Sequence, residues 1–257
     1  MRYHKQTVVG LFAFILLFLG GPKDLFANGS DSFINFRPGA RAIQGKFTVY
    51  DMPLDYASPH CLAPDQQGNI WYVAYGSNRV GKLDPERKEF TEYLVPTHES
   101  QPHGITVDKD GLVWFTEAGK DKIGRLDPKS GTITEYRTPT AKSGPRRLTI
   151  DPQGLIWYAE WDAHKIGYIN PKTLEQKEFT PPSYPKAGTY AIASDGAGNL
   201  YVAEFISNQV SRFEPKTGKW TEWQMPLRRS RVRNIIVDPR GYVWYADNGN
   251  SKLVRLE

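Results

Sequence analysis

Short apolar runs separated by turn residues fill most of the chain after residue 46. Between His103 and Pro139, residues 104–107 and 112–116 are mostly apolar and β-branched, and residues 122–126 and 132–136 alternate polar with apolar side chains. Such runs, bounded by turn residues, are typical of short β-strands. The pattern therefore predicts a four-stranded antiparallel meander in this stretch.

The same unit recurs five times at a spacing of 43 or 44 residues. Each unit has an Asp after its first strand, a Gly in the next turn, an aromatic residue in its second strand and a Pro after a fourth strand. These series are Asp65, Asp108, Asp151, Asp195 and Asp238; Gly68, Gly111, Gly154, Gly198 and Gly241; Trp71, Trp114, Trp157, Tyr201 and Trp244; and Pro53, Pro96, Pro139, Pro182 and Pro226. A period near 40 with four strands per unit is the signature of a β-propeller. Because all units share these residues, we expect them to form turns and pack blades rather than to catalyse.

The two ends of the repeat region complement each other. The chain ends after a third strand, residues 252–256, whereas residues 47–53 match the fourth-strand segment at 90–96. An N-terminal strand that completes the last sheet would remove the open edges of a ring. The sequence therefore predicts an all-β fold: a β-propeller of five four-stranded antiparallel blades, closed by an N-terminal strand that completes the last blade.

The first 27 residues resemble a secretory signal. Basic residues precede an apolar run from Val8 to Leu19, and two glycines and a proline follow it. Since the run is short for a membrane span, we expect cleavage after Ala27, with an uncleaved anchor as the alternative. We thus expect a signal peptide at 1–27, a lead-in segment at 28–45 and a propeller domain at 46–257. The mature protein would be periplasmic or secreted, without stable membrane insertion.

Composition narrows the choice of partners. The chain has 33 Lys and Arg against 28 Asp and Glu, a net charge of +5, and its Lys and Asp residues are interleaved. This mild excess predicts a solvated surface and no nucleic-acid partner. Four arginines between Arg228 and Arg233 are the exception, and they would hold an anionic group or form a solvated loop. Because Cys61 is the single cysteine, no intrachain disulfide forms, and we expect Cys61 to be a small core residue. We also expect the protein to be a monomer.

Two sets of positions differ between the units and are therefore free to serve chemistry. One set lies five residues before each Asp and comprises His60, His103, Arg146, Tyr190 and Arg233; the other lies three residues after each aromatic and comprises Ala74, Glu117, Glu160, Glu204 and Asp247. Since the second strand runs antiparallel to the first, its end returns to the edge where the first strand began. Both sets are therefore expected on one rim, with His98, Trp161 and His164 in the adjoining loops.

Such a rim predicts a polar pocket at the centre of the ring. Converging carboxylates either hold a divalent cation or repel one another, unless arginines lie between them. Oxygen ligands suit Mg²⁺ or Ca²⁺, and imidazole shifts the preference towards Zn²⁺ or Mn²⁺. The alternative is structural: the carboxylates would cap backbone amides or pair with Arg146 and Arg233, and the histidines would bind loop carbonyls.

Three segments of the second unit resemble a known repeat. Residues 102–108 read Pro-His-Gly-Ile-Thr-Val-Asp, residues 113–117 read Val-Trp-Phe-Thr-Glu and residues 122–126 read Lys-Ile-Gly-Arg-Leu. They are similar to the repeat of the virginiamycin B lyase (streptogramin lyase) family, and the resemblance extends from Thr48 to the C-terminus. It implies a propeller that opens a cyclic depsipeptide by elimination at its ester bond, aided by Mg²⁺ and by histidines in Pro-His segments of adjacent blades. The chain differs from the family pattern at Gln101, where the family has Glu, at Arg146, where it has Tyr, and in having five units instead of seven.

On this resemblance we expect an exported, metal-assisted lyase that opens an ester of a small-molecule or peptide substrate. His103 would act as general base or acid with His60 as its partner, and Mg²⁺ would be held by Glu117 and Glu160. The side chains expected to bind substrate are Arg146, Tyr190, Arg233 and Trp161. The alternatives are a non-catalytic propeller that binds a ligand or protein on its rim, and a metal-dependent lactonase.

Overall fold

The computed structural model describes residues 47–257, so the expected signal peptide and lead-in segment lie outside the described residues. The chain divides into two units, Met1–Val49 and Tyr50–Glu257. All strands described below belong to the second unit. Among the described residues, none forms a helix with the length and apolar character needed to cross a membrane.

Five antiparallel sheets make up the second unit. The first contains β1 (Pro59–Pro64), β2 (Ile70–Ala74), β3 (Arg79–Asp84) and β4 (Glu89–Leu94). The second contains β5 (Pro102–Val107), β6 (Val113–Glu117), β7 (Lys122–Asp127) and β8 (Thr132–Arg137). The third contains β9 (Pro145–Ile150), β10 (Ile156–Glu160), β11 (Lys165–Ile169) and β12 (Gln176–Phe179). The fourth contains β13 (Thr189–Ser194), β14 (Leu200–Glu204), β15 (Gln209–Glu214) and β16 (Lys219–Gln224), and the last contains β17 (Ile235–Val237), β18 (Val243–Asp247) and β19 (Lys252–Leu256).

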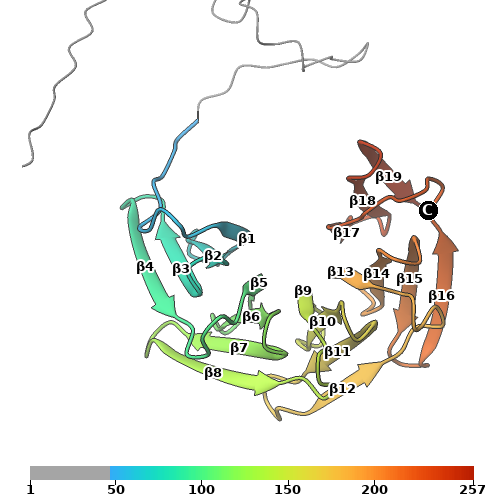
Figure 1. Cartoon of the computed structure of the whole chain (residues 1–257), viewed down its shortest axis with the longest axis horizontal. Coiled ribbons are helices and arrows are strands. Elements are labelled where there is room, and N and C mark those ends of the chain that lie inside the picture. Colours follow the sequence, from blue (N-terminus) through green and yellow to red (C-terminus); the bar gives the residue numbers. More distant parts are fainter. Residues whose placement is uncertain (1–46) are drawn as a thin grey trace, which may run out of the picture. The chain divides into compact units, whose positions relative to one another are not determined.

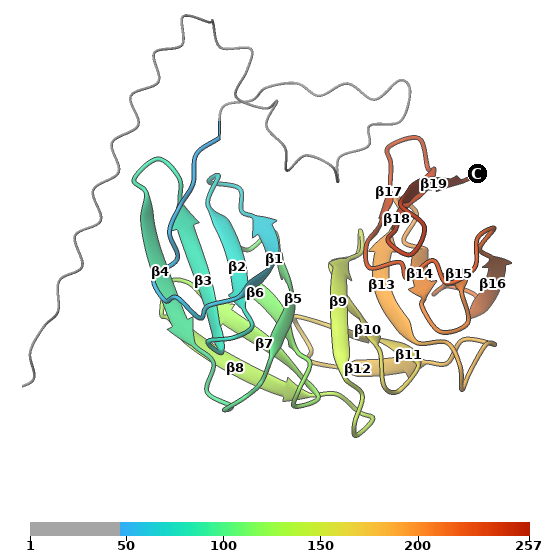
Figure 2. The ribbon, with the colours of Figure 1, turned by 45° about the horizontal axis from the view of Figure 1, so that its top comes forward.

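Within this unit the sheets follow one another in sequence order, with their first strands on the inner side. Strands β1, β5, β9, β13 and β17 contact one another in turn, whereas β4, β8, β12 and β16 lie on the outer side (Figure 1). Figure 2 shows the same order from another angle, with each sheet stacked against the next. This is the blade arrangement of a propeller, so the predicted all-β fold with five repeated blades is confirmed.

Closure of the ring by an N-terminal strand stays a prediction. The last sheet has three strands, β17, β18 and β19, and residues 47–52 carry no strand in the described part of the chain. At the outer edge of this sheet, the side chain of Leu253 is 80% exposed. The fourth strand of the last blade is therefore not formed here.

The repeated Asp residues hold both the turn and the tryptophan that follows. Asp108 Oδ1 accepts hydrogen bonds from the backbone N–H groups of Asp110 and Leu112, both at 2.9 Å, and Asp108 Oδ2 accepts one from Trp114 Nε1 at 2.8 Å. The turn also needs Gly111, whose φ of 82° lies in the left-handed region that favours glycine. The structural role predicted for these series is therefore confirmed at this turn.

Apolar side chains from neighbouring sheets fill the space between blades. Val113 and Phe115 of β6, both fully buried, pack in one cluster with Trp71 and Val80 of the first sheet. Burial of aromatic and branched side chains removes apolar surface from water and is the main stabilising term of such an interface. The blades thus share their core with their neighbours, which fixes the spacing of the inner strands.

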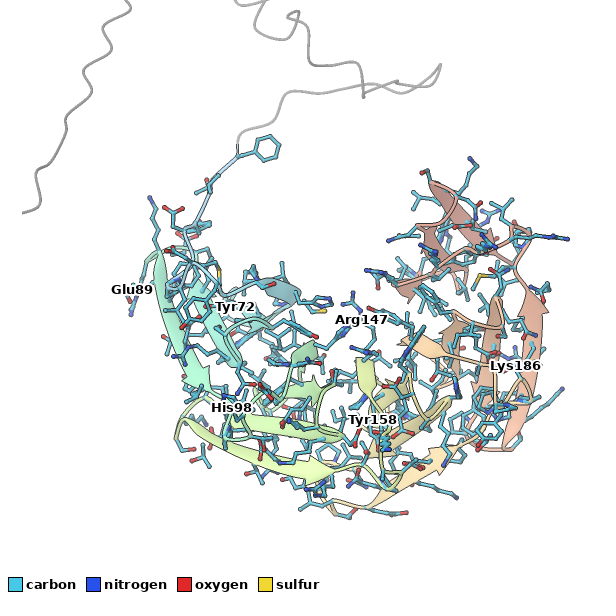
Figure 3. The ribbon with its side chains drawn as sticks, in the orientation of Figure 1. Tyr72, Glu89, His98, Arg147, Tyr158 and Lys186 are labelled. Atoms are coloured by element: carbon cyan, nitrogen blue, oxygen red, sulfur yellow. The ribbon has the colours of Figure 1, made fainter. Side chains whose placement is uncertain are left out.

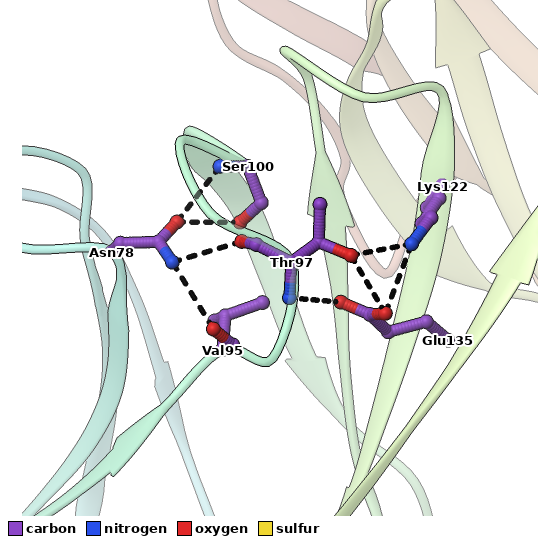
Figure 4. Close-up of polar contacts among 6 residues, drawn as sticks. All are labelled: Asn78, Val95, Thr97, Ser100, Lys122 and Glu135. Carbon is purple, nitrogen blue, oxygen red and sulfur yellow. Dashed lines mark hydrogen bonds and ion pairs between the residues drawn. The ribbon is translucent and has the colours of Figure 1, made fainter.

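A second repeated contact, which the sequence analysis did not predict, joins each of the first four blades to the loop that leads into the next blade. One residue in the turn between the second and third strands has a positive φ, and its side chain accepts a hydrogen bond from a backbone N–H of the next loop. These residues are Asn78 (to Ser100, 2.8 Å), Asp121 (to Gly144, 3.1 Å), His164 (to Gly188, 2.9 Å) and Asn208 (to Ser230, 2.8 Å). Asn78 also donates to the carbonyls of Val95 and Thr97 (Figure 4). We call these four residues the latch residues.

The His164 latch yields a stability prediction. His164→Ala should lower the free energy of unfolding by about 1 to 2 kcal/mol, because it leaves the buried Gly188 N–H without a partner. His164→Asn should retain stability, since Asn fills the same position in two other blades and tolerates a positive φ. Urea denaturation measures both variants. Equal losses in the two variants would show that the acceptor atom at residue 164 does not stabilise the loop.

Candidate functional site

The two Pro-His segments begin adjacent inner strands and bring their imidazoles together. His60 lies at the start of β1 and His103 at the start of β5, and both strands have a register irregularity just after the proline. Such bulges re-aim side chains at the end of a strand. The ring centroids of His60 and His103 lie 4.1 Å apart.

The hydrogen bonds of His60 define its tautomer. His60 Nδ1 lies 3.2 Å from the carbonyl oxygen of His103 and 3.1 Å from Cys61 Sγ. Because a carbonyl oxygen can only accept, Nδ1 must carry the hydrogen in that bond. In the neutral ring Nε2 then keeps a free lone pair, and the His60 side chain is exposed. His60 can therefore accept a proton from a bound molecule.

His103 is enclosed, with 3% of its surface exposed. Its Nε2 lies 3.1 Å from the hydroxyl of Tyr190, which comes from β13 two sheets away. Tyr190 is in turn held by edge-on packing against Trp161, with ring centroids 5.6 Å apart. Three of the residues selected from the sequence, His103, Tyr190 and Trp161, thus form one connected group with His60.

Both imidazoles are neutral at pH 7. Burial, followed by the nearby His60 and the Arg146 guanidinium, lowers the pKa of His103 to about 2. Burial and the positive charge of Arg147 also hold the pKa of His60 below its ordinary value of 6.5. Lowered pKa values keep the histidine lone pairs available over the whole neutral range.

A small cavity lies where the inner strands converge. It has a volume of about 200 Å³, and its walls include one equivalent position from every sheet: Cys61, Gly104, Arg147, Ala191 and Asn234. Arg147 is the one charged residue among them, lies at the inner strands (Figure 3) and donates a hydrogen bond to Cys61 Sγ. Burial raises the pKa of the Cys61 thiol by more than Arg147 lowers it. The thiol is therefore a neutral wall of this cavity.

A larger cavity of about 820 Å³ lies between the first two sheets. Its walls include Tyr56, Tyr75, His98, Gln101 and Lys120, and the Tyr75 ring centroid lies 6.1 Å from that of His60. A volume of this size is typical of sites that enclose small molecules. Tyr75 thus connects a wall of this cavity with His60, although His60 itself does not line the cavity.

The carboxylates selected as metal ligands lie in separate junctions between blades. Glu117 is fully buried beside Glu135 and Lys122, and Lys122 Nζ lies 2.9 Å from Glu135 Oε2 (Figure 4). Burial, followed by repulsion from Glu135, raises the pKa of Glu117 to about 8. Burial alone would also raise the pKa of Glu135, but hydrogen bonds from Lys122 and from Thr97 outweigh it and lower that pKa.

The next junction repeats this arrangement. Glu160 is fully buried beside Glu178, and Glu178 Oε2 forms an ion pair with Lys165 Nζ at 2.9 Å. Burial and then Glu178 raise the pKa of Glu160 to about 9. The raised pKa values favour the protonated forms of Glu117 and Glu160 at pH 7, and each lies beside a second glutamate, although their carboxyl oxygens have no hydrogen-bond partner in the described structure. We refer to Glu117–Glu135 and Glu160–Glu178 as the acid pairs.

The donors at the histidines do not fit Mg²⁺. Within residues 47–257, the group of three potential ligands whose atoms lie within 4.8 Å of one another is His60, Cys61 and His103. Nitrogen and sulfur donors suit softer metals, whereas Mg²⁺ requires oxygen ligands. Glu117 and Glu160 do not join this group. Binding of Mg²⁺ by these two residues stays a prediction of the sequence.

The two remaining rim carboxylates have structural partners. Glu204 accepts hydrogen bonds from the hydroxyls of Ser183 at 2.5 Å, Ser207 at 2.7 Å and Ser211. Asp247 accepts from the side chain and backbone of Asn250. Asp247 therefore caps a backbone amide, as the structural alternative expected, whereas Glu204 is held by serine hydroxyls that the sequence analysis did not name.

Comparison with known proteins agrees with this architecture. No curated protein matches the chain. The solved structure of virginiamycin B lyase from Staphylococcus aureus is 30% identical, with a TM-score of 0.78 over 83% of this chain and 71% of that chain. A catalytically inactive histidine-to-alanine variant of the S. aureus enzyme, with quinupristin, is 29% identical, with a TM-score of 0.78 over 84% of this chain and 72% of that chain. A streptogramin B lyase structure is 29% identical, with a TM-score of 0.72 over 80% of this chain and 70% of that chain. The model of the virginiamycin B lyase family matches residues 37–257. The chain therefore belongs to the virginiamycin B lyase family.

Proposed function

We propose that this protein is a carbon–oxygen lyase that opens an ester of a small or cyclic substrate by elimination. The observation that carries the proposal is the His60 ring, whose Nδ1 is held by the His103 carbonyl and whose Nε2 keeps a free lone pair on an exposed side chain. Family membership supports it, as does the relative from S. aureus whose catalytically inactive histidine-to-alanine variant was solved with quinupristin.

In the proposed reaction His60 Nε2 takes a proton from the carbon next to a carbonyl group of the substrate. The electron pair of that C–H bond forms a carbon–carbon double bond, the neighbouring C–O bond breaks, and its electron pair leaves with the carboxylate. Imidazole suits this step because it is neutral at pH 7 and becomes a cation that can return the proton to solvent. This proton transfer does not use Mg²⁺, because the nitrogen and sulfur donors at the histidines do not fit that ion.

The proposal exchanges the roles of the two histidines relative to the expectation from the sequence, which made His103 the general base or acid and His60 its partner. The 3% exposure of His103 and the contact of its Nε2 with Tyr190 favour a positioning role. His103 would orient His60 through its carbonyl, and Tyr190 would fix the His103 ring. Preorganisation of this kind keeps a base within reach of one substrate atom.

Product analysis tests the proposal. The purified protein is incubated with quinupristin and with simpler depsipeptide esters, and the products are examined by mass spectrometry and NMR. Elimination within a ring leaves the mass unchanged and creates an alkene, which is the expected result. Addition of one water with an alcohol product would indicate a lactonase, and binding without conversion would indicate a non-catalytic propeller; either result overturns the lyase assignment.

The setting of this activity is also proposed from the sequence. The signal-like segment at residues 1–27 supports export to the periplasm or the exterior, where a small-molecule or peptide substrate would be met by a monomeric protein. Fractionation of cells that express the full chain, followed by N-terminal sequencing of the mature protein, measures export and cleavage together. Uncleaved protein in the membrane fraction would contradict removal of the segment.

A further inference from the structure

We propose that Arg146, Arg147 and Arg233 form a carboxylate-binding site beside His60, and that the substrate presents a carboxylate, or releases one, at this place. That the bound carboxylate belongs to the substrate rests on the proposed function.

The three arginines come together at the inner strands. Arg146 and Arg147 begin β9, and Arg233 precedes β17 at the repeat position that His60 occupies in the first unit. All three guanidinium groups lie near enough to His60 to disfavour its protonation. One histidine and three arginines from three different sheets therefore lie at the same edge of the inner strands.

These arginines lack the partners that other arginines of the chain have. Within residues 47–257 no Asp or Glu lies at ion-pair distance from any of the three, whereas Arg79 pairs with Glu92 and Arg212 pairs with Glu214. The Nε atoms of Arg146 and Arg147 are also buried without a hydrogen-bond partner in the described structure, as are those of Arg79 and Arg212, so the missing ion pair is what sets Arg146 and Arg147 apart. Buried unpaired donors cost free energy unless a ligand or water satisfies them.

The arrangement favours an anion over a neutral or cationic ligand. Guanidinium groups that lie near one another without a counterion repel, and a planar fork of N–H donors matches a carboxylate in a bidentate manner. Arg147 also lines the cavity of about 200 Å³, which has room for a small group but not for a whole peptide. The chemistry therefore points to one carboxylate group at the inner strands.

The position also suits the proposed elimination, in which the C–O bond breaks and negative charge collects on a carboxylate. Positive charge placed where negative charge develops stabilises the transition state more than the ground state. The arginines would then bind the carboxylate that leaves. A substrate with its own free carboxylate would use the same donors before the reaction begins.

Calorimetric titration tests the site without any turnover. The probes are N-acetylphenylalanine as its carboxylate, the corresponding neutral amide, and inorganic phosphate. We expect the carboxylate to bind and the amide not to bind. Arg146→Gln and Arg233→Gln should each weaken carboxylate binding about tenfold, the effect of losing one charged hydrogen bond. Arg137→Gln removes the same charge from an exposed position at the end of β8 and should leave the affinity unchanged.

A second readout separates a direct role from a structural one. In the NMR titration of the His60 ring, Arg233→Gln should raise the pKa of His60, since one of the guanidinium groups that lower it is gone. Equal binding of carboxylate and amide, equal weakening by Arg137→Gln, or binding of phosphate alone would overturn the carboxylate site. Carboxylate binding by a protein that opens no ester would keep this site and remove the lyase, so the two proposals fail separately.

Discussion

Replacement of His60 by alanine is expected to lower kcat/KM for ester elimination about 1,000-fold, within the range typical for the loss of a general base. The reason is geometric: His60 Nδ1 is committed to the His103 carbonyl, so its Nε2 is the exposed imidazole nitrogen left with a free lone pair. The rate of alkene formation is measured by chromatography at several substrate concentrations, which gives kcat and KM separately. The loss should appear mainly in kcat, because the base acts on the proton only in the transition state.

The matched control is His164→Asn, which removes an imidazole from a latch position and should retain the activity of the parent. The pH profile adds a second test. Because burial and Arg147 hold the pKa of His60 below 6.5, kcat/KM should already be on its plateau at pH 7 and should decline only below pH 6.5. A His60→Ala protein that folds and turns over as fast as the parent would eliminate His60 as the base.

The blade architecture is readable from the sequence because two signals agree. Alternation of polar and apolar side chains marks each strand, and a fixed spacing repeats Asp, Gly and aromatic residues in register. Asp108 shows why the repeat is strict, since one side chain holds two backbone N–H groups and the Trp114 indole. A contact that recurs in each blade leaves a mark in the sequence each time, so it can be recognised without a structure.

The meeting of His60 and His103 is predictable for the same reason. Equivalent positions at the start of adjacent inner strands must lie near one another in a propeller, and their ring centroids are 4.1 Å apart. Tyr190 reaches His103 from two sheets further on. Its hydrogen bond depends on how tightly the inner strands converge, which the repeat pattern does not specify.

The repeat pattern does not determine the direction in which the side chains of Glu117 and Glu160 point. Topology places the end of the second strand at the correct edge of each sheet, but successive side chains of a strand point to opposite faces. One more signal was present in the sequence: Lys122 with Glu135 and Lys165 with Glu178 recur at the same 43-residue spacing. A repeated Lys–Glu pair indicates a polar junction between blades, and such a junction is where the two glutamates lie.

The acid pairs give the prediction with the largest expected effect on stability. Glu117 and Glu160 have raised pKa values of about 8 and about 9 in the folded protein, against 4.5 when unperturbed. The folded state therefore holds two protons that the unfolded state has already lost at neutral pH, so stability must fall as pH rises through the folded-state values. Between about pH 7 and about pH 9 the free energy of unfolding should decrease by about 4 kcal/mol. The histidines add no slope in this window, because they are neutral in both states.

Urea denaturation of the Glu117→Gln, Glu160→Gln double variant measures the effect of these two groups alone. Glutamine keeps a hydrogen-bond donor next to Glu135 and Glu178 but cannot ionise, so the double variant should lose most of the slope and be more stable than the parent at pH 9. Glu89→Gln, on the exposed face of β4, is the control for a changed net charge and should retain the slope. A flat profile in the parent would mean that Glu117 and Glu160 are already ionised in the folded protein.

Addition of Mg²⁺ distinguishes the two roles of these carboxylates, since a metal site requires their ionised form. If Mg²⁺ stabilises the parent at pH 9 but not the double variant, the two glutamates bind the metal and do not act through their protonated forms.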